Sequence, residues 1–206
     1  MLDGIFRSLS CCAPVQETLR VNSSVLQQAI RVTLEPFVKA VTICDRPTRN
    51  QSGLTQYHYD DNRDAIRQRR VAVAREFDLS LSDAPFDRRF VAMLAAETER
   101  AHGMPGQCAE MASLSAIHLQ DLARDANHQV YTLQLPDCNH TITLLSPSVY
   151  RAKEWVDWNQ EFEVGAVVVD LWQGALSQDN PAALVSAADE NRYTKISPRA
   201  LVQCDV

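Results

Sequence analysis

The hydrophobic period of this chain changes once, and that change limits the fold more than any other feature. Up to about Asp125 the long patterned segments have the spacing of amphipathic helices. From Gln129 to Leu135 apolar and polar residues alternate, and a second alternating run begins at His140 after four turn-forming residues. Helices followed by paired strands predict an α+β fold, in which a helical N-terminal half packs on a small antiparallel sheet.

Helical patterns and turn residues divide the chain further. Pro36 is expected to kink or end the first helix. Pro85 lies just inside the third helix, and Gly103 follows its end. The polar segment from Asp45 to Asp61 is predicted to be a loop. The predicted helices cover residues 23–44, 62–77, 85–103 and 108–125, and a helical or irregular piece around Trp155 and Trp158 leads to a predicted strand at 164–170.

Length and charge limit the classes of protein to consider. A chain of 206 residues, 46% of them hydrophobic and 22% charged, can bury the core of one ordinary domain. We assign residues 23–206 to that domain and residues 1–22 to a tail. The net charge is -6 and no Lys/Arg cluster dominates a face, so no nucleic-acid partner is indicated. The basic run Arg67-Gln68-Arg69-Arg70 is expected to be a solvated helix face, with a docking patch for an acidic partner as the alternative.

The cysteines and the N-terminal residues give an indication of the cellular compartment in which the protein works. Six cysteines are too thinly spread for a disulfide scaffold, and no cleaved secretory signal precedes them. No run approaches the ~18 apolar residues of a membrane-spanning helix. The tail carries a short apolar stripe before Cys11 and Cys12. We interpret it as a loose end, and the alternative is a membrane-touching segment acylated at one of these two cysteines.

One cysteine lies where its surroundings would activate it. Cys108 follows the helix breaker Pro105-Gly106 and begins a long helix-forming run. There the positive end of the helix dipole and the unpaired backbone N–H groups favour the thiolate, which is the reactive form of cysteine. Glu110 is expected in the first helical turn, where a negative charge is stabilised. Cys108 is therefore the candidate nucleophile, and a small buried hydrophobic residue is its alternative role.

Two further residues complete a candidate triad with Cys108. His140 begins a strand-like run, and Asp170 ends an apolar one. Each interval holds enough chain for one helix or loop plus one strand, so folding can bring the three residues together. His140 would then exchange a proton with the thiol while Asp170 fixes its tautomer. The alternatives are a core histidine with satisfied hydrogen bonds and an aspartate that caps the next turn.

A metal site is the alternative to this triad. Cys138 and His140, with Cys108 and Asp170, would supply a mixed set of ligands. Their spacing matches no zinc module, and Cys138 lies on a turn. No glycine-rich phosphate loop or dinucleotide fingerprint is present either. We therefore expect neither a metal nor another cofactor.

At these residues the chain resembles the papain-like and transglutaminase superfamily of thiol enzymes. Gly106-Gln107-Cys108 resembles the transglutaminase nucleophile motif. His140 at a strand start and Asp170 at a strand end resemble the family's base and orienting residue. The resemblance covers residues 103–174 well and implies a papain-like or transglutaminase-like fold with the nucleophile at a helix N-terminus.

Neighbouring residues refine the comparison. On the enzyme interpretation Gln107 and the backbone N–H of Cys108 help form an oxyanion pocket, although Gln107 can also be a polar loop residue. Trp172 is either a wall of the site or an ordinary core residue. The chain departs from the family at Ala109, where an aromatic residue is usual. With this departure and its compact size, the chain is most similar to bacterial effector enzymes. These are thiol proteases, glutamine deamidases and transglutaminases that are delivered into host cells.

The predicted function is acyl transfer from a protein amide through a thioester on Cys108, with residues 23–206 as the catalytic domain. Glutamine deamidation or transglutamination of a host protein is favoured. Cysteine proteolysis is the alternative, because all three reactions share one thiol chemistry. A non-catalytic binding module on the same fold is the rival from a different class. The resemblance to effectors implies synthesis in a bacterial cytoplasm and delivery to the host cytosol by a specialised secretion system.

Overall fold

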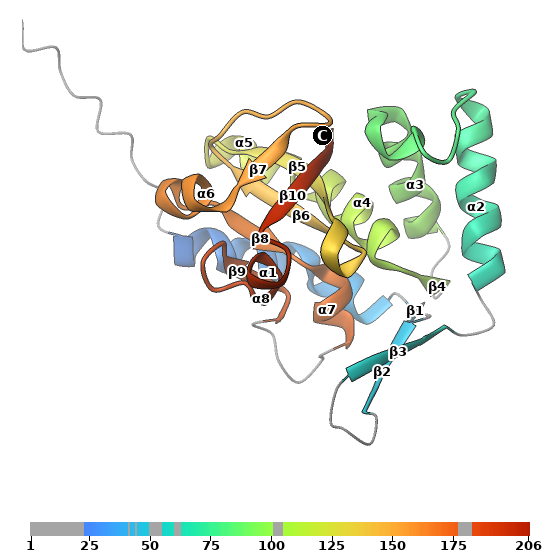
Figure 1. Cartoon of the computed structure of the whole chain (residues 1–206), viewed down its shortest axis with the longest axis horizontal. Coiled ribbons are helices and arrows are strands. Elements are labelled where there is room, and N and C mark those ends of the chain that lie inside the picture. Colours follow the sequence, from blue (N-terminus) through green and yellow to red (C-terminus); the bar gives the residue numbers. More distant parts are fainter. Residues whose placement is uncertain are drawn as a thin grey trace, which may run out of the picture.

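The fold is α+β, with one antiparallel sheet enclosed by helices (Figure 1). The computed structural model describes residues 23–40, 42–43, 45–49, 55–59, 63–100, 105–176 and 183–206. The tail predicted over residues 1–22, with Cys11 and Cys12, lies outside the described residues. The α+β class predicted from the change of period is confirmed.

The predicted hairpin forms the centre of the sheet. Strand β5 (Gln129–Leu135) pairs antiparallel with β6 (His140–Ser146), so Leu135 lies opposite His140. The connection is a short 3-10 helix, η2 (Pro136–Cys138), which ends at Asn139 in the left-handed conformation with φ 46°. Asparagine adopts that conformation more readily than most residues. The turn thereby makes His140 the first residue of its strand.

Six strands complete the main sheet, and every neighbouring pair is antiparallel. The spatial order is β7-β10-β5-β6-β8-β9, so the last strand in the chain lies between β5 and β7. Strand β8 falls inside the segment predicted as a strand, whereas no strand was predicted beyond residue 170. The remaining strands are β7 (Trp155–Asp157), β8 (Val167–Val169), β9 (Val185–Ala187) and β10 (Arg199–Asp205).

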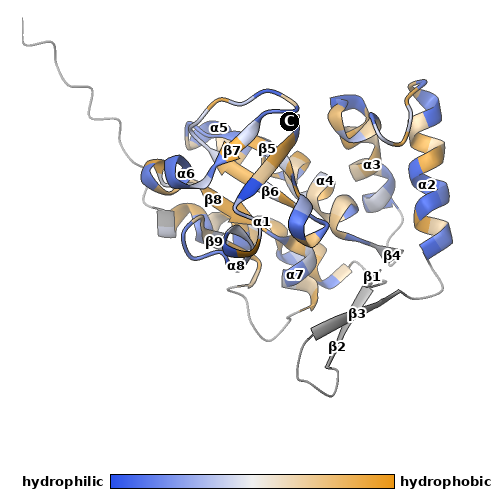
Figure 2. Ribbon diagram, viewed as in Figure 1, coloured by the Kyte–Doolittle hydropathy of each residue, from blue (hydrophilic) through white to orange (hydrophobic). Residues whose placement is uncertain are grey.

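Both faces of the sheet carry apolar clusters, because alternate residues of a strand point to opposite faces. Val167 and Val169 belong to one cluster, and Val168 between them belongs to the other. Leu145 and Leu144 divide in the same way. In Figure 2 the hydrophobic colour is accordingly strong on strand β8.

Eight helices surround the sheet within the described residues. The first extends through Pro36 to Ala40, short of the predicted end at 44. The third begins at Arg88, because Pro85 belongs to a preceding 3-10 turn, η1 (Ala84–Phe86). None of the described helices is both long and apolar enough to cross a bilayer. The helices are α1 (Ser23–Ala40), α2 (Arg63–Glu76), α3 (Arg88–Arg100), α4 (Cys108–His118), α5 (Gln120–Asp125), α6 (Trp158–Val164), α7 (Leu171–Leu176) and α8 (Arg192–Ile196).

The helix predicted over residues 108–125 is divided in two. Helix α4 ends at His118 and α5 begins at Gln120, with the buried Leu119 between them. The continuous helical pattern hid this break, since no glycine or proline marks it. Helix α4 packs on β6, and α2 with α3 covers its other side (Figure 1). A third apolar cluster joins α2 and α3 to Cys204 of β10.

The loop predicted from Asp45 to Asp61 is wrong in part. Strands β2 (Asp45–Arg49) and β3 (Thr55–Tyr59) form an antiparallel hairpin within it. The sequence Thr-Gln-Tyr-His-Tyr of β3 is polar overall, but threonine and tyrosine are favoured in strands. Two short strands, β1 (Thr42–Ile43) and β4 (Pro105–Gly106), pair in parallel just before the start of α4.

Candidate active site

Cys108 is the first residue of α4, and its side chain is partly exposed. Gln107 caps the helix in an extended conformation, with φ -119° and ψ -173°. Its backbone N–H donates a hydrogen bond to Glu110 Oε2 at 3.0 Å, which is one half of a capping box. The strand pair β1–β4 ends at Gly106, immediately before this cap. The cysteine is therefore positioned by a strand on one side and a capped helix on the other.

His140 and Asp170 form a buried pair. The distance from His140 Nε2 to Asp170 Oδ2 is 2.7 Å, and the two residues are only 5% and 3% exposed. The sheet register explains their approach, since Thr143 of β6 lies opposite Val169 of β8. Continuing this register places Asp170 opposite Ile142, two residues from His140 and on the same side of the strand.

The second oxygen of Asp170 has a separate role. Oδ1 accepts a hydrogen bond from the backbone N–H of Gln173 at 3.0 Å, within the first turn of α7. Capping of the next turn is the alternative role that the sequence suggests for Asp170. The structure combines both roles, because each carboxylate oxygen serves one of them.

The Cys108 thiol lies close enough to His140 to contribute to the raised pKa of the imidazole. Since Nε2 is engaged by Asp170, Nδ1 is the ring nitrogen that remains available to the thiol. The structure thus brings together the three residues that the sequence analysis singled out, in the order thiol, imidazole, carboxylate. The arrangement can move a proton between the thiol and the imidazole while the carboxylate holds the ring.

The charge state of His140 follows from its surroundings. Burial is the largest influence and by itself would lower the pKa of the imidazole. The charge and hydrogen bond of Asp170, followed by those of Cys108, outweigh burial and raise the pKa of His140 from 6.5 to about 10. The imidazole is therefore protonated at neutral pH, with Asp170 hydrogen-bonded to it and the Cys108 thiol nearby.

Two aromatic rings enclose the imidazole. The ring of Trp172 lies 5.2 Å from that of His140, and the ring of Tyr193 lies 4.7 Å from it. Trp172 is 6% exposed, so it is a wall of the site and part of the core at once. Aromatic rings within about 6 Å attract a cation. Tyr193 of α8 was missed by sequence analysis, because nothing in its polar neighbourhood indicates that it reaches His140.

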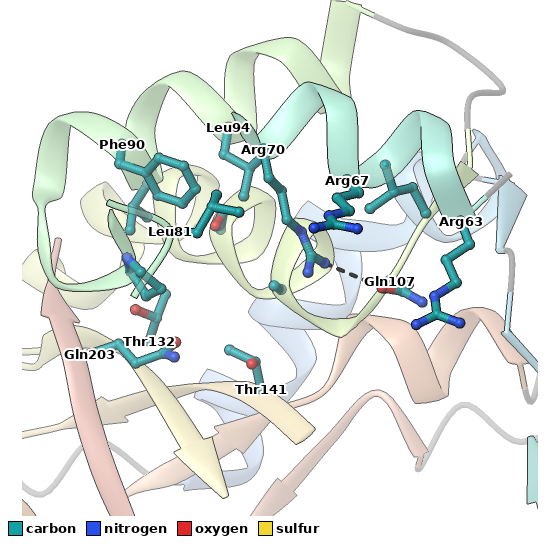
Figure 3. A pocket seen from close by; sticks show the side chains of 15 residues that line it. Arg63, Arg67, Arg70, Leu81, Phe90, Leu94, Gln107, Thr132, Thr141 and Gln203 are labelled. Atoms are coloured by element: carbon teal, nitrogen blue, oxygen red, sulfur yellow. Dashed lines mark hydrogen bonds between the residues drawn. The ribbon is translucent and has the colours of Figure 1, made fainter. Parts of the chain in front are cut away.

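A buried ion pair supports the start of α4. Arg70 Nε and Nη2 each lie 2.6 Å from one oxygen of Glu110, whose side chain is fully buried. Arg70 Nη2 also donates to Gln107 Oε1 at 3.4 Å (Figure 3). The expectation of a solvated basic face is therefore wrong for Arg70. The pattern Gln107-x-x-Glu110 can be recognised in the sequence as a capping box. Its partner Arg70, forty residues upstream, cannot be recognised in this way.

The other described thiols differ from Cys108. Burial raises the pKa of Cys204 to about 12, and burial together with the charge of Asp137 raises the pKa of Cys138. Both therefore hold their protons near neutral pH. Among the described cysteines, Cys108 is the one that contributes to the raised pKa of His140.

Candidate metal ligands and comparisons with known proteins give no further information about the role of this site. In the part of the chain that the structure describes, no group of three or more His, Cys, Asp or Glu residues is placed to hold a metal ion. Comparison with protein-family models, with curated proteins and with solved structures finds no match for the chain. The functional interpretation therefore depends on the site itself.

Proposed function

We propose that this protein is a cysteine-dependent acyltransferase that acts on glutamine side chains of a protein substrate, on a papain-like or transglutaminase-like fold. The observation that carries the proposal is the buried His140–Asp170 pair close to a partly exposed thiol at a helix N-terminus. A nucleophile, a base and an orienting carboxylate in this order constitute the minimum machinery for acyl transfer.

The first half of the reaction forms a thioester. The Cys108 sulfur attacks the carboxamide carbon of a substrate glutamine, and the carbonyl oxygen becomes an oxyanion. The backbone N–H of Cys108 lies in the first turn of α4, where it has no partner within the helix, and it donates to that oxygen. When the tetrahedral intermediate collapses, the C–N bond breaks and His140 gives its proton to the departing nitrogen, so ammonia leaves.

The second half releases the acyl group. His140, now neutral, takes a proton from water or from an amine as that molecule attacks the thioester. The C–S bond breaks and the imidazolium and thiolate are restored. Water gives glutamate, whereas a primary amine gives a substituted amide. Throughout both steps Asp170 holds the ring by Nε2, which keeps Nδ1 directed at the reacting atoms.

Gln107 is assigned to orient the oxyanion. Arg70 binds its Oε1, and this contact turns the Nε2 end of the amide away from Arg70. Glu110 holds Arg70 in turn through two short contacts. We propose that the chain Glu110–Arg70–Gln107 fixes the side chain beside the nucleophile. The resemblance of Gly106-Gln107-Cys108 to transglutaminase-type sites favours glutamine over a backbone amide, and it supports a bacterial effector with a host protein as substrate.

The test uses host-cell lysate with a labelled primary amine. Wild type is compared with Cys108→Ala, and Cys138→Ala is the matched control because Cys138 is a second partly buried thiol nearby. We expect amine-labelled or more acidic target proteins with wild type and with Cys138→Ala, and none with Cys108→Ala. Discrete fragments without label or charge shift would overturn the glutamine proposal in favour of proteolysis.

A thiol probe separates enzyme from binding module. Iodoacetamide at pH 6 followed by peptide mapping reports which cysteine reacts. We expect Cys108 to be alkylated much faster than Cys138 and Cys204, because only Cys108 is paired with a protonated imidazole. Equal, slow alkylation of all three would mean that the triad is vestigial and that the protein binds its partner without chemistry.

A further inference from the structure

A cavity of about 360 Å³ lies between α4 and the helix pair α2–α3 (Figure 3). Gln107 and Ala109, the neighbours of Cys108 on either side, line it. Thr141, the neighbour of His140, lines it too. The lining therefore includes residues that are adjacent in the sequence to both the proposed nucleophile and the proposed base.

One wall of the cavity is apolar, and the cavity has room for a large side chain. A cavity of about 150 Å³ holds a benzene ring, so this one accommodates a phenylalanine or leucine side chain with room beyond it. The space is therefore suited to one residue of a substrate rather than to solvent alone. The apolar lining consists of Ile66, Leu81, Pro85, Phe90, Val91 and Leu94.

The deep end of the cavity carries a buried hydroxyl. Thr132 of β5 is 2% exposed and lines the cavity, and its Oγ1 has no hydrogen-bond partner in the part of the chain that is described. An unpaired buried hydroxyl is unfavourable unless something satisfies it. Gln203 and Thr141 lie in the same lining (Figure 3). A bound segment that offers a backbone N–H or C=O would complete this set.

The mouth of the cavity is basic. Arg63, Arg67 and Arg70 follow one another at helical spacing on α2 and all line the cavity (Figure 3). Glu110 neutralises Arg70. Arg67 is exposed and makes no ion pair with any residue of the described ranges. A negatively charged group is therefore the complementary partner at this end.

We infer that this cavity is the specificity subsite for the residue next to the target glutamine, and that it selects a large apolar side chain with an acidic residue beside it. The inference rests on the proposed function, since it places the glutamine at Cys108. An extended peptide spaces its residues by about 3.3 Å, so the residue beside the target glutamine lies within reach of a cavity lined by Gln107 and Ala109. The occupant is thus a segment of a protein substrate, anchored by its apolar residue and oriented by Arg67.

The test uses short peptides in which the glutamine is replaced by its diazoketone analogue, an electrophile that alkylates the nucleophilic cysteine. The flanking residues are Phe with Asp, Phe with Lys, or Ala with Ala. We expect the Phe–Asp peptide to react at least about tenfold faster than the Ala–Ala peptide. It should exceed the Phe–Lys peptide by about two- to fivefold, as expected for one exposed charge pair.

Reversing the charge of Arg67 tests whether this residue causes the preference for an acidic neighbour. Arg67→Glu should remove or invert the preference for Asp over Lys and keep the preference for Phe. Arg75→Glu is the matched control, because Arg75 is exposed on the same helix but outside the cavity, and it should behave like wild type. Thr132→Val keeps the shape of the side chain and should slow all peptides with Phe by a common factor.

Iodoacetamide distinguishes the two proposals, since it needs only the thiol. If its rate at Cys108 is normal while all peptides react alike, the subsite is overturned and the proposed function stands. If Cys108 does not react with iodoacetamide, the proposed function fails. In that case binding of the unmodified glutamine peptides to the Cys108→Ala protein decides the subsite, and equal affinities for Phe–Asp and Ala–Ala would overturn it.

Discussion

Asp170 holds His140 with one carboxylate oxygen at 2.7 Å and caps helix α7 with the other. The orientation of the imidazole is therefore tied to the position of a helix. Trp172, two residues after Asp170, belongs to that helix and packs on the imidazole from a second side. A shift of α7 would move the carboxylate and the aromatic wall together.

Replacing Asp170 by Asn should preserve the fold and remove most of the activity. Asparagine is as good a helix cap as aspartate, so α7 keeps its first turn. The amide cannot stabilise the imidazolium and favours the wrong tautomer, which in a serine-protease triad costs about 10⁴-fold in rate. We expect a loss on the order of 10²-fold or more in alkylation or turnover at Cys108, with little change in the urea midpoint.

Asp157→Asn is the control for that substitution. Asp157 caps α6 by accepting from the backbone N–H of Asn159 at 3.0 Å, and it has no histidine partner in the described structure. Its variant should retain full reactivity. Near-normal turnover of Asp170→Asn would remove Asp170 from the triad.

Stability should fall as pH rises above neutrality, with His140 as one source. The folded pKa of His140 is raised to about 10 from 6.5, so the folded state binds one proton more than the unfolded state between these values. The stabilisation is complete below about pH 6.5 and is lost as pH approaches 10, with a slope of about 1.4 kcal/mol per pH unit. Urea unfolding from pH 6 to pH 10 measures it.

The same urea-unfolding series with Asp170→Asn isolates the contribution of His140, since the other groups that titrate between pH 6 and pH 10 are common to both proteins. The charge and hydrogen bond of Asp170 are the main causes that raise this pKa. The variant should therefore show a flatter dependence. Parallel curves for the two proteins would contradict a protonated His140 at neutral pH.

Arg70→Met should destabilise the protein strongly, because it leaves the fully buried Glu110 carboxylate without its cation. Breaking a buried pair costs about 3–5 kcal/mol, and the partial exposure of Arg70 puts the expected loss at the lower end. Adding Glu110→Gln should restore most of the stability, since Gln still accepts the hydrogen bond from the backbone of Gln107. Urea unfolding compares the three proteins.

Arg100→Met provides the matched control for this pair. Arg100 pairs with Glu97 on the surface of α3, where a salt bridge is worth about 0–1 kcal/mol. Its loss should hardly change the urea midpoint. A similarly small effect of Arg70→Met would show that water reaches Glu110 and that the start of α4 does not depend on the ion pair.

Gly174→Ala tests the coupling between α7 and the triad. A Cβ at this position would lie 3.0 Å from both Cβ and Cδ1 of Leu184 and 3.3 Å from its Cα, so Leu184 or α7 has to give by a few tenths of an ångström. Asp170 donates its backbone N–H to Leu184 O at 2.8 Å, which ties this adjustment to the Asp170 carboxylate. Overpacking costs about 1–3 kcal/mol, more than the ~1 kcal/mol that alanine contributes in a helix. We expect lower stability and slower alkylation of Cys108.

Gly165→Ala and a second-site change serve as controls. Gly165 ends α6 with φ 77°, where alanine is strained by about 1–2 kcal/mol although nothing lies within 4 Å. That variant should lose stability but not thiol reactivity. Leu184→Ala should rescue the reactivity of Gly174→Ala by making room. Unchanged alkylation in Gly174→Ala alone would uncouple α7 from the triad.

The residues predicted from sequence share a property. Cys108, His140 and Asp170 each lie at the end of an element whose local pattern is readable: a breaker before a helix, a turn before a strand, and the end of an apolar run. The spacing of apolar residues also sufficed for the hairpin and for the helix from Arg63 to Glu76.

The residues that were missed depend on contacts between distant segments. Arg70 finds Glu110 only because α2 folds back over α4, and Tyr193 reaches His140 from the last described helix. A basic run on a polar helix face gives no indication of a buried partner. The strands β2 and β3 lie in the segment predicted as a loop, because their polar composition outweighs their strand-forming threonines and tyrosines.

The position of β10 has a consequence for how this protein folds. Residues 199–205 follow every other described strand in the chain, yet they lie between β5 and β7, and Cys204 packs with α2 and α3. Cys108, His140 and Asp170 all precede this strand in the chain, so the sheet beside them is complete only after β10 has paired with its two neighbours. Assembly of the candidate site is therefore expected to depend on a late contact between segments that are far apart in the sequence.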